Sequence, residues 1–284
     1  MSEAPNQGAC GHSHGPDLAQ EDRLQQALDQ IRFKLLVMSG KGGVGKSTVA
    51  AYLALGLAAR GFAVGLLDVD LHGPSIPRML GLNGHALVQE QEQRISPMVT
   101  KHGLKVLSVE MLMPDRESSV IWRGPLKIGV IKQFISDVEW GALDFLVIDS
   151  PPGTGDEPLT VAQSVDGALA VVVTTPQEIA LADVRKSLDF CRQVQMPVLG
   201  LVENMSGLTC PHCGRPVELL GQGGGQELAQ RLGLSLLARL PWDSRLVQAG
   251  DSGQPLELEH DYNAAGPQYR ELVQSVLIRT AQRS

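Results

Sequence analysis

The sequence predicts an α/β fold: one domain built on a mostly parallel, twisted sheet with helices on both faces. Segments with the pattern of strands alternate with segments that have the pattern of helices along most of the chain. Several strand-like segments, such as 145–148 and 170–173, are apolar at every position, which is typical of parallel strands buried on both faces. We find no linker and no internal repeat, so we expect one domain over residues 23–284.

The first predicted elements follow an N-terminal tail. Residues 1–22 are rich in Gly, Pro, Ser, Asn and His, and we expect this tail to be disordered. An amphipathic helix is expected at 24–31. Next come a strand, a helix and a strand at 33–38, 46–60 and 63–68. A less regular stretch at 71–100 precedes a strand and a helix, at 104–109 and about 125–138.

The second half of the chain continues the alternation. Continuous apolar runs predict strands at 144–149, 168–174 and 198–203, and helices are expected between them near 158–165 and 178–194. A loop with two cysteines follows, and after it we expect a helix near 225–232, a short strand near 236–240 and a final helix at about 262–280. The apolar residues of this last helix fall on one face: Leu272, Val273, Val276 and Leu277.

Composition excludes several classes of protein. The chain has 284 residues, of which 43% are hydrophobic and 19% charged, as in an ordinary globular protein. Its net charge of −7 argues against nucleic acid as the main partner. No apolar run approaches the roughly 18 residues of a membrane span, and the polar N-terminus does not resemble a signal peptide. Four cysteines fit a reducing compartment, so we expect a cytoplasmic protein without a membrane partner.

A phosphate-binding loop lies between the first apolar strand and the next helix. The pattern G-x-x-x-x-G-K-S/T is matched by Gly40, Gly45, Lys46 and Ser47. Glycines let main-chain N–H groups surround a phosphate, Lys46 reaches the β/γ oxygens, and the Ser47 hydroxyl is placed to bind Mg²⁺. This pattern predicts a P-loop NTPase domain. The candidate nucleotide-binding residues are Gly40, Lys41, Gly42, Gly43, Val44, Gly45, Lys46, Ser47 and Thr48.

Acidic residues end two other predicted strands. Asp68 and Asp70 follow one of them, and Asp149 ends the apolar run before Ser-Pro-Pro-Gly-Thr-Gly. An NTPase needs such carboxylates to support the metal and to orient the attacking water. A single aspartate at a strand end is often a helix cap or a turn residue. Three of them in a chain with a phosphate loop favour a catalytic role, and the Gly- and Pro-rich segment after Asp149 can shift when the γ-phosphate leaves.

A pair of cysteines, Cys210 and Cys213, lies in the predicted loop at 207–214. Two thiolates supply half of a four-ligand metal site. The first interpretation is a cluster or zinc ion shared across a two-fold axis, with two cysteines from each subunit. A zinc knuckle within one chain, completed by His212 or a distant residue, is the second. A redox dithiol is the weakest, because the pair does not begin a helix in a thioredoxin-like unit.

The phosphate loop with its second lysine, the Asp68–Asp70 pair and the segment from Asp149 to Asp156 resemble the deviant-Walker NTPases. This group includes the Min and Par positioning ATPases and the nitrogenase iron protein. The resemblance implies a homodimer in which Lys41 reaches the partner's ATP. It also implies that Asp70 orients water, that Asp149 supports the Mg²⁺ shell, and that Asn204 recognises adenine. An ordinary turn asparagine is the alternative for Asn204.

Together with the cysteine pair, these motifs resemble the Mrp/ApbC-type iron–sulfur cluster carrier ATPases over residues 32–280. The matching segments are 40–48, 68–75, Trp-Arg-Gly-Pro at 122–125, 149–156, Glu-Asn-Met-Ser at 203–206, and 210–213. The resemblance implies a 4Fe–4S cluster bridging two subunits, one per dimer, and its transfer to apo-proteins, with cluster-assembly scaffolds as further partners. It also implies that ATP binding is needed in the cycle. We expect slow hydrolysis, because no catalytic glutamine or arginine finger can be identified.

The N-terminus departs from one branch of this family, whose eukaryotic members carry four cysteines there. Only Cys10 is present, followed by His12 and His14. This segment could bind a metal weakly, but a flexible polar tail is the favoured interpretation. Cys191 lies within a predicted amphipathic helix and is expected to be a buried apolar residue.

Two other functions compete with cluster transfer. Min-type positioning ATPases bind membranes through a basic, amphipathic C-terminal helix. Only three arginines accompany the apolar face of the last helix here, so we expect it to pack on the sheet, and this function leaves Cys210 and Cys213 unexplained. In a nitrogenase-like reductase, ATP gates electron transfer from a bridging cluster held by two well-separated cysteines. The adjacent pair in this chain fits a transferable cluster better.

Overall fold

The structure, a computed structural model, describes residues 18–283 except 72, 83, 85, 90–93, 113–123, 211, 218 and 261–264. The N-terminal segment with Cys10, His12 and His14 therefore lies outside the described residues. The same holds for Trp122 and Arg123 of the segment at 122–125.

An eight-stranded sheet organises the described part of the chain, in the order β12-β9-β8-β1-β7-β2-β6-β5. All neighbouring pairs are parallel except β5 and β6. In chain order the strands are β1 (Ile31–Ser39), β2 (Val64–Asp68), β5 (Met98–Val99), β6 (Lys105–Ser108), β7 (Leu143–Asp149), β8 (Ala168–Thr174), β9 (Val198–Glu203) and β12 (Leu236–Arg239). Every residue of β8 is buried, as its continuous apolar sequence predicts.

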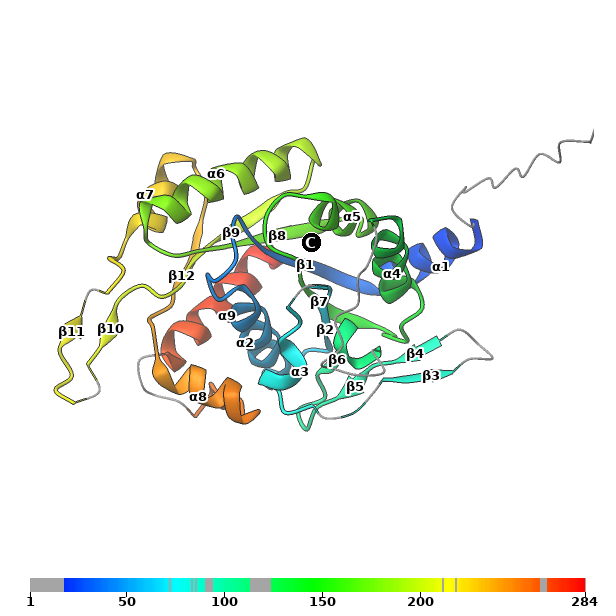
Figure 1. The fold of residues 1–284 in the computed structure, drawn as a ribbon, viewed down its shortest axis with the longest axis horizontal. Helices are drawn as coiled ribbons and strands as arrows, with labels where there is room; N and C mark the ends of the chain where they lie inside the picture. The colour runs from blue at the N-terminus through cyan, green and yellow to red at the C-terminus, as the bar shows by residue number, and fades with distance from the viewer. Residues whose placement is uncertain are drawn as a thin grey trace, which may run out of the picture.

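Helices cover both faces of this sheet (Figure 1). One layer contains α2 (Lys46–Ala59), α3 (Ile76–Met79), α8 (Ser244–Ser252) and α9 (Gly266–Ala281). The opposite layer contains α4 (Gly124–Ser136), α5 (Asp156–Ser164), α6 (Glu178–Gln193) and α7 (Gly224–Arg231). Helix α1 (Leu18–Asp29) packs beside α4. The predicted α/β fold with helices on both faces is therefore confirmed.

Several short elements were not expected from the sequence. The irregular stretch at 71–100 contains α3, β5 and a small hairpin, and helix α8 precedes the last helix. The strands β3 (Leu87–Gln89) and β4 (Arg94–Ser96) form that hairpin, and a 3₁₀ helix (Val109–Leu112) follows β6. Elements of two to four residues are too short to show a hydrophobic period, which explains why they were missed. Helix α1 begins at Leu18, four residues before the expected end of the tail.

The cysteines lie in the turn of a small two-stranded hairpin, whose strands were not predicted. Strands β10 (Leu208–Thr209) and β11 (Pro216–Val217) pair antiparallel. Figure 1 shows this hairpin projecting from the body of the domain, on the side of β9 and β12. The cysteines therefore stand at the end of a protrusion, away from the central strands.

The last helix packs on the domain itself, as expected. Leu272, Val273 and Val276 of α9 are buried, and the helix contacts α2, β9 and β12. Cys191 is also buried, and its thiol lies 3.5 Å from the sulfur of Met38. Burial raises the pKa of the Cys191 thiol to about 11. Among the described residues, no helix has the length and apolar character needed to cross a bilayer.

Candidate functional site

The phosphate loop joins the end of the central strand β1 to the first turn of α2. Gly45, which immediately precedes α2, has φ = 78° and ψ = 27°, a left-handed conformation that favours glycine. A Cβ atom at this position would lie 2.3 Å from Nδ2 of Asn204, so a side chain is also excluded by space. The N-terminus of α2 and the main-chain N–H groups of the loop form the environment that binds a phosphate.

Lys46 is held by two carboxylates, one at the end of β7 and one two residues after the end of β2. Its Nζ lies 2.5 Å from Oδ1 of Asp149 and 3.8 Å from Oδ2 of Asp70. The Lys46 side chain is only 6% exposed and that of Asp149 is fully buried. Buried charges are tolerated when they are paired, so this ion pair compensates the cost of placing Lys46 in the loop.

The parallel sheet brings the three predicted aspartates together. Asp68 and Asp149 are register partners at the ends of β2 and β7. Asp68 accepts hydrogen bonds from the Ser108 hydroxyl (3.1 Å) and the Asp70 main-chain N–H (3.1 Å). Burial first, and the neighbouring charge of Asp149 second, raise the pKa of Asp68 to about 8. Asp68 therefore binds its proton more tightly than an exposed aspartate does.

The oxygen atoms in this cluster fit a hard divalent cation. Burial raises the pKa of Asp149, an effect that the adjacent Lys46 opposes. Its Oδ2 atom is buried and has no hydrogen-bond partner within the described residues. The Ser47 hydroxyl is also close, because it lies 3.5 Å from the Lys46 ammonium group that pairs with Asp149. Carboxylate and hydroxyl oxygens are the ligands that Mg²⁺ prefers, so Ser47 and Asp149 could hold this ion beside a phosphate.

Lys41 lies within the phosphate loop, whereas Asn204 follows β9 and contacts the loop from outside. The Lys41 residue is half-buried, and its side chain makes no hydrogen bond or ion pair within the described part of the chain. Asn204 is buried, and its side-chain amide donates a 2.9 Å hydrogen bond to the carbonyl of Val44. The structure therefore places Asn204 against the phosphate loop. Adenine recognition by Asn204 and the action of Lys41 across a dimer stay predictions.

The cysteine pair lies between β10 and β11. Two main-chain hydrogen bonds of 2.9 Å shape the turn, one joining Cys210 to Arg215 and the other Gly214 to Cys210. Cys213 is exposed and Cys210 is half-buried, and both are free thiols. Hydrogen bonds from the main-chain N–H groups of Cys213 and His212, and from the Cys213 thiol, lower the pKa of Cys210. The Cys213 thiol therefore lies within hydrogen-bonding reach of the Cys210 sulfur.

A complete metal site is not formed by these residues alone. Within the described residues, no group of three or more His, Cys, Asp and Glu side chains is arranged to hold a metal ion. The zinc knuckle within one chain, with His212 as a third ligand, consequently has no support in the described geometry. Within the described residues, one protomer therefore supplies two sulfur ligands, Cys210 and Cys213, to a metal site.

Sequence reasoning missed three residues that organise the site. Ser108 supports Asp68, and Glu203 connects the cysteine segment to α7. Met205 adopts φ = 56°, an uncommon conformation for a residue with a side chain. The acidic residue at the end of the apolar strand 198–203 was the available signal for Glu203. No local signal marks Ser108. Met205 belongs to the matched segment at 203–206, but that motif does not indicate its conformation, which depends on neighbours from other strands.

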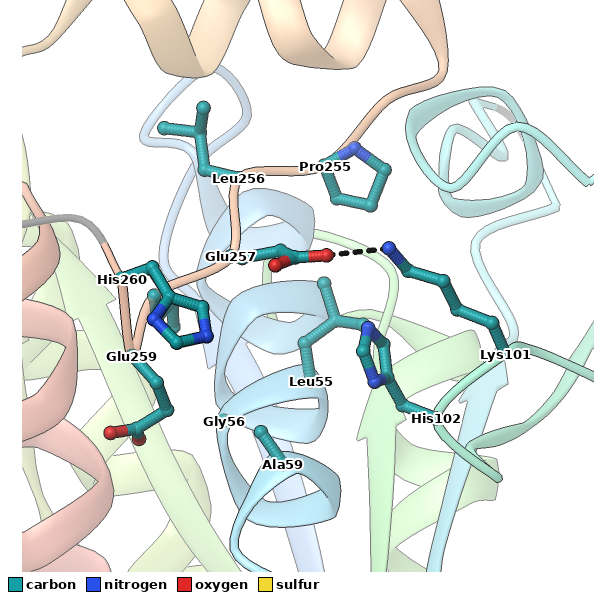
Figure 2. Close-up of a pocket in the computed structure, with 11 residues that line it drawn as sticks. Leu55, Gly56, Ala59, Lys101, His102, Pro255, Leu256, Glu257, Glu259 and His260 are labelled. Carbon is teal, nitrogen blue, oxygen red and sulfur yellow. Dashed lines mark hydrogen bonds and ion pairs between the residues drawn. The ribbon is translucent and has the colours of Figure 1, made fainter.

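A separate cavity of about 240 Å³ lies against the last turns of α2 (Figure 2). Lys101 and Glu257 form an ion pair of 2.6 Å at its edge, where His102 and His260 also lie. Leu55 lines this cavity nine residues after Lys46. At 1.5 Å per residue, it lies about 14 Å along the helix from the phosphate loop. The cavity is therefore distinct from the phosphate site.

The fold and the site together define the class of protein. A glycine-rich loop between the central strand and its helix, with strand-terminal carboxylates around the loop lysine, is the site of a P-loop NTPase. The chain belongs to the family of NUBPL iron-transfer P-loop NTPases, a ParA family whose model matches residues 30–277. The family resemblance predicted from the motifs is therefore confirmed.

Curated relatives cover most of the chain. The iron-sulfur cluster carrier protein of Methanocaldococcus jannaschii is 47% identical over 245 residues, which are 85% of this chain and 83% of that protein. The cytosolic Fe-S cluster assembly factor CFD1 of Eremothecium gossypii is 46% identical over 263 residues, which are 89% of this chain and 94% of that protein.

Solved structures agree with the fold. A nucleotide-binding protein from Archaeoglobus fulgidus, in complex with ADP, is 42% identical and superposes with a TM-score of 0.73. The similarity covers 82% of this chain and 91% of that one. The cell division ATPase MinD of Pyrococcus furiosus is 22% identical, with a TM-score of 0.63 over 87% of this chain and 99% of its own, and shows the shared fold alone.

Proposed function

We propose that the protein is an ATP-dependent carrier of iron–sulfur clusters. The observation that carries this proposal is the cysteine pair, whose thiols lie within hydrogen-bonding reach of each other on a projecting hairpin, without a third ligand in the described residues. A 4Fe–4S cluster requires four thiolates. A second protomer related by a two-fold axis supplies the other two, so one cluster bridges the dimer. The names of the relatives from M. jannaschii and E. gossypii support cluster transfer to apo-proteins.

ATP is the nucleotide that this site takes in the proposed cycle, and the ADP complex of the A. fulgidus relative supports nucleotide binding. In this cycle Lys46 moves from Asp149 to the phosphates and Asp70 orients the attacking water; the ion pairs of Lys46 with both carboxylates support these roles. Ser47 and Asp149 would hold Mg²⁺, which when bound neutralises phosphate charge. Slow hydrolysis coupled to cluster binding and release completes the proposal.

Homodimerisation follows from two features that one protomer leaves incomplete. The Lys41 side chain has no partner in the described part of its own chain, and the cysteine pair is half of a cluster site. In the proposed dimer Lys41 contacts the partner's nucleotide. Cluster-assembly scaffolds are proposed as donors. The cytosolic relative from E. gossypii supports a cytoplasmic location.

The competing functions have less support. A positioning ATPase of the Min type needs a free apolar helix face, whereas Leu272, Val273 and Val276 of α9 are buried in the domain. A reductase would keep its cluster through repeated redox cycles, whereas a pair on a projecting hairpin, with Cys213 exposed and Cys210 half-buried, favours release. Redox cycling without loss of iron would support the reductase instead.

The test is metal analysis of the dimer after anaerobic reconstitution. We expect about four iron and four sulfide per dimer, and transfer to an apo-acceptor. Replacing Cys210 and Cys213 by serine removes both the cluster and its transfer, whereas Cys191→Ala, at a buried cysteine of α6, retains the cluster. If the Cys210→Ser/Cys213→Ser protein keeps its iron and still activates the acceptor, the carrier function is wrong.

A further inference from the structure

Glu203 is a fully buried acidic residue at the end of β9 that the nucleotide chemistry does not use. Its Oε1 accepts hydrogen bonds from the Ser206 hydroxyl (2.5 Å) and the Gly223 main-chain N–H (2.8 Å). Its Oε2 accepts from the Gly225 main-chain N–H (2.5 Å). Arg239 Nε lies 3.5 Å from Oε1. Three hydrogen bonds and one ion pair therefore converge on a single carboxyl group, which restricts its position.

These contacts attach both ends of the cysteine segment to the same carboxyl group. Ser206 lies just before β10, and Gly223 is the N-cap of α7, which follows β11. A Cβ atom on Gly225 would lie 2.9 Å from Oε2 of Glu203, so glycine at this position allows the carboxyl group to reach the helix N-terminus. Everything between Ser206 and Gly223, including the cysteine pair, is thus anchored at its start and its end by Glu203.

The two residues that follow Glu203, Asn204 and Met205, lie against the phosphate loop. Asn204, the next residue, donates to the carbonyl of Val44, and the Met205 methyl group lies 3.5 Å from the position of a Cβ on Gly45. Main-chain hydrogen bonds on both sides hold Met205 at φ = 56°: Asn204 N–H to Thr174 (2.7 Å) and Ser206 N–H to Leu240 (2.9 Å). A left-handed conformation at a residue with a side chain persists only where its surroundings impose it.

We propose that Glu203 is a positioning residue that couples nucleotide binding in the phosphate loop to the geometry of the Cys210–Cys213 pair. A ligand in the loop changes what the Val44 carbonyl and the Asn204 amide contact. Because Asn204 adjoins Glu203, a shift there alters the hydrogen bonds that anchor both ends of the cysteine segment. By thermodynamic reciprocity, occupancy of the cysteine pair changes nucleotide affinity by the same factor. The inference rests on the proposed function, since it describes regulation of the proposed cluster site.

The test measures thiol reactivity in the full-length, reduced, metal-free protein. Iodoacetamide is the probe, and mass spectrometry of the peptide containing Cys210 and Cys213 gives its alkylation rate with and without ADP. In the unmodified protein we expect ADP to change this rate about fivefold or more, the lower range of allosteric coupling. In Glu203→Gln, which keeps the shape but loses the charge, the two rates become equal. ADP affinity, measured by calorimetry, stays within about twofold.

Glu227→Gln is the matched control, because Glu227 lies exposed in the first turn of the same helix α7. It should retain the full ADP effect. If Glu203→Gln does not fold, Ser206→Ala removes one of the three hydrogen bonds and should reduce the ADP effect at least about twofold. An ADP effect of unchanged size in whichever of the two variants folds, or the absence of any ADP effect in the unmodified protein, overturns the coupling.

The outcome is distinguishable from failure of the proposed function. A dimer that binds and transfers its cluster but shows no ADP effect on thiol reactivity contradicts the role of Glu203 alone. A protein that shows the ADP effect but never binds iron through Cys210 and Cys213 contradicts the carrier function alone.

Discussion

The ammonium group of Lys46 lies 2.5 Å from the carboxylate of Asp149, and both side chains are almost completely buried. In the nucleotide-free protein, the charge of the lysine expected to bind phosphate is therefore balanced by Asp149 at the end of β7. This relationship gives Lys46 two roles, one in binding the nucleotide and one in stabilising the domain. Unfolding experiments on the nucleotide-free protein measure the stabilising role alone.

Lys46→Ala should lower the free energy of unfolding of the nucleotide-free protein by about 3–5 kcal/mol, because it leaves the buried Asp149 without its partner. Urea unfolding measures this loss. Adding Asp149→Asn to the same chain should restore part of it. Lys41→Ala in the same loop is the control and should change stability by less than about 0.5 kcal/mol. Equal effects of the two lysine substitutions would show that the ion pair does not stabilise the fold.

Gly45→Ala should destabilise the phosphate loop without any nucleotide present. Alanine would have to adopt the left-handed conformation of this position, at a cost of about 1–2 kcal/mol. Its Cβ would lie only 2.3 Å from the Asn204 amide nitrogen, so the Asn204 side chain would have to move. Gly42→Ala is the matched control, because a Cβ there has no neighbour within 4 Å. We expect that variant to change the unfolding free energy by less than about 1 kcal/mol. Chemical denaturation of both variants, compared with the unmodified chain, decides the question.

Asp68 should make the nucleotide-free protein less stable as the pH rises. Its pKa in the folded state, about 8, exceeds its ordinary value of 3.8, so the folded state binds the proton more tightly. This contribution is complete below about pH 4, falls by up to about 1.4 kcal/mol per pH unit, and is lost above pH 8. Asp68→Asn should remove the fall, whereas Asp166→Asn, at an exposed position, should retain it. Parallel pH profiles for Asp68→Asn and the unmodified protein would contradict this pKa.

Lys41→Ala should leave the monomer folded but abolish ATP-dependent dimerisation. In the proposed dimer this lysine contacts the partner's phosphates, so its loss should reduce ATP hydrolysis at least about tenfold. Sedimentation with a non-hydrolysable ATP analogue measures the dimer. Lys186→Ala, which removes an exposed lysine on α6, is the control. If Lys41→Ala dimerises and hydrolyses ATP normally, the lysine does not act across the subunit boundary.

Much of the fold could be predicted because the central strands are long and apolar throughout. The predicted bounds of 168–174 and 198–203 agree with β8 and β9 to the residue. The short strands β3, β4, β10 and β11 escaped prediction, since two or three residues carry no period. Helix α8 was missed too, although Asp243 caps it through a 2.9 Å hydrogen bond to the Arg245 main-chain N–H. The capping residue alone did not predict helix α8, because this helix lacks a long apolar face.

The sequence by itself determined the α/β fold, the phosphate loop and the family, because the loop binds through main-chain groups of consecutive residues whose spacing is visible in the chain. Only the tertiary structure decided how the parts contact one another. Asn204 is hydrogen-bonded to Val44, which lies 160 positions away in the sequence, and Lys46 is paired with Asp149, which lies 103 positions away. The hydrogen bonds of Glu203 likewise depend on a helix that follows the cysteine hairpin. Such contacts result from strand order and burial, which no local pattern specifies.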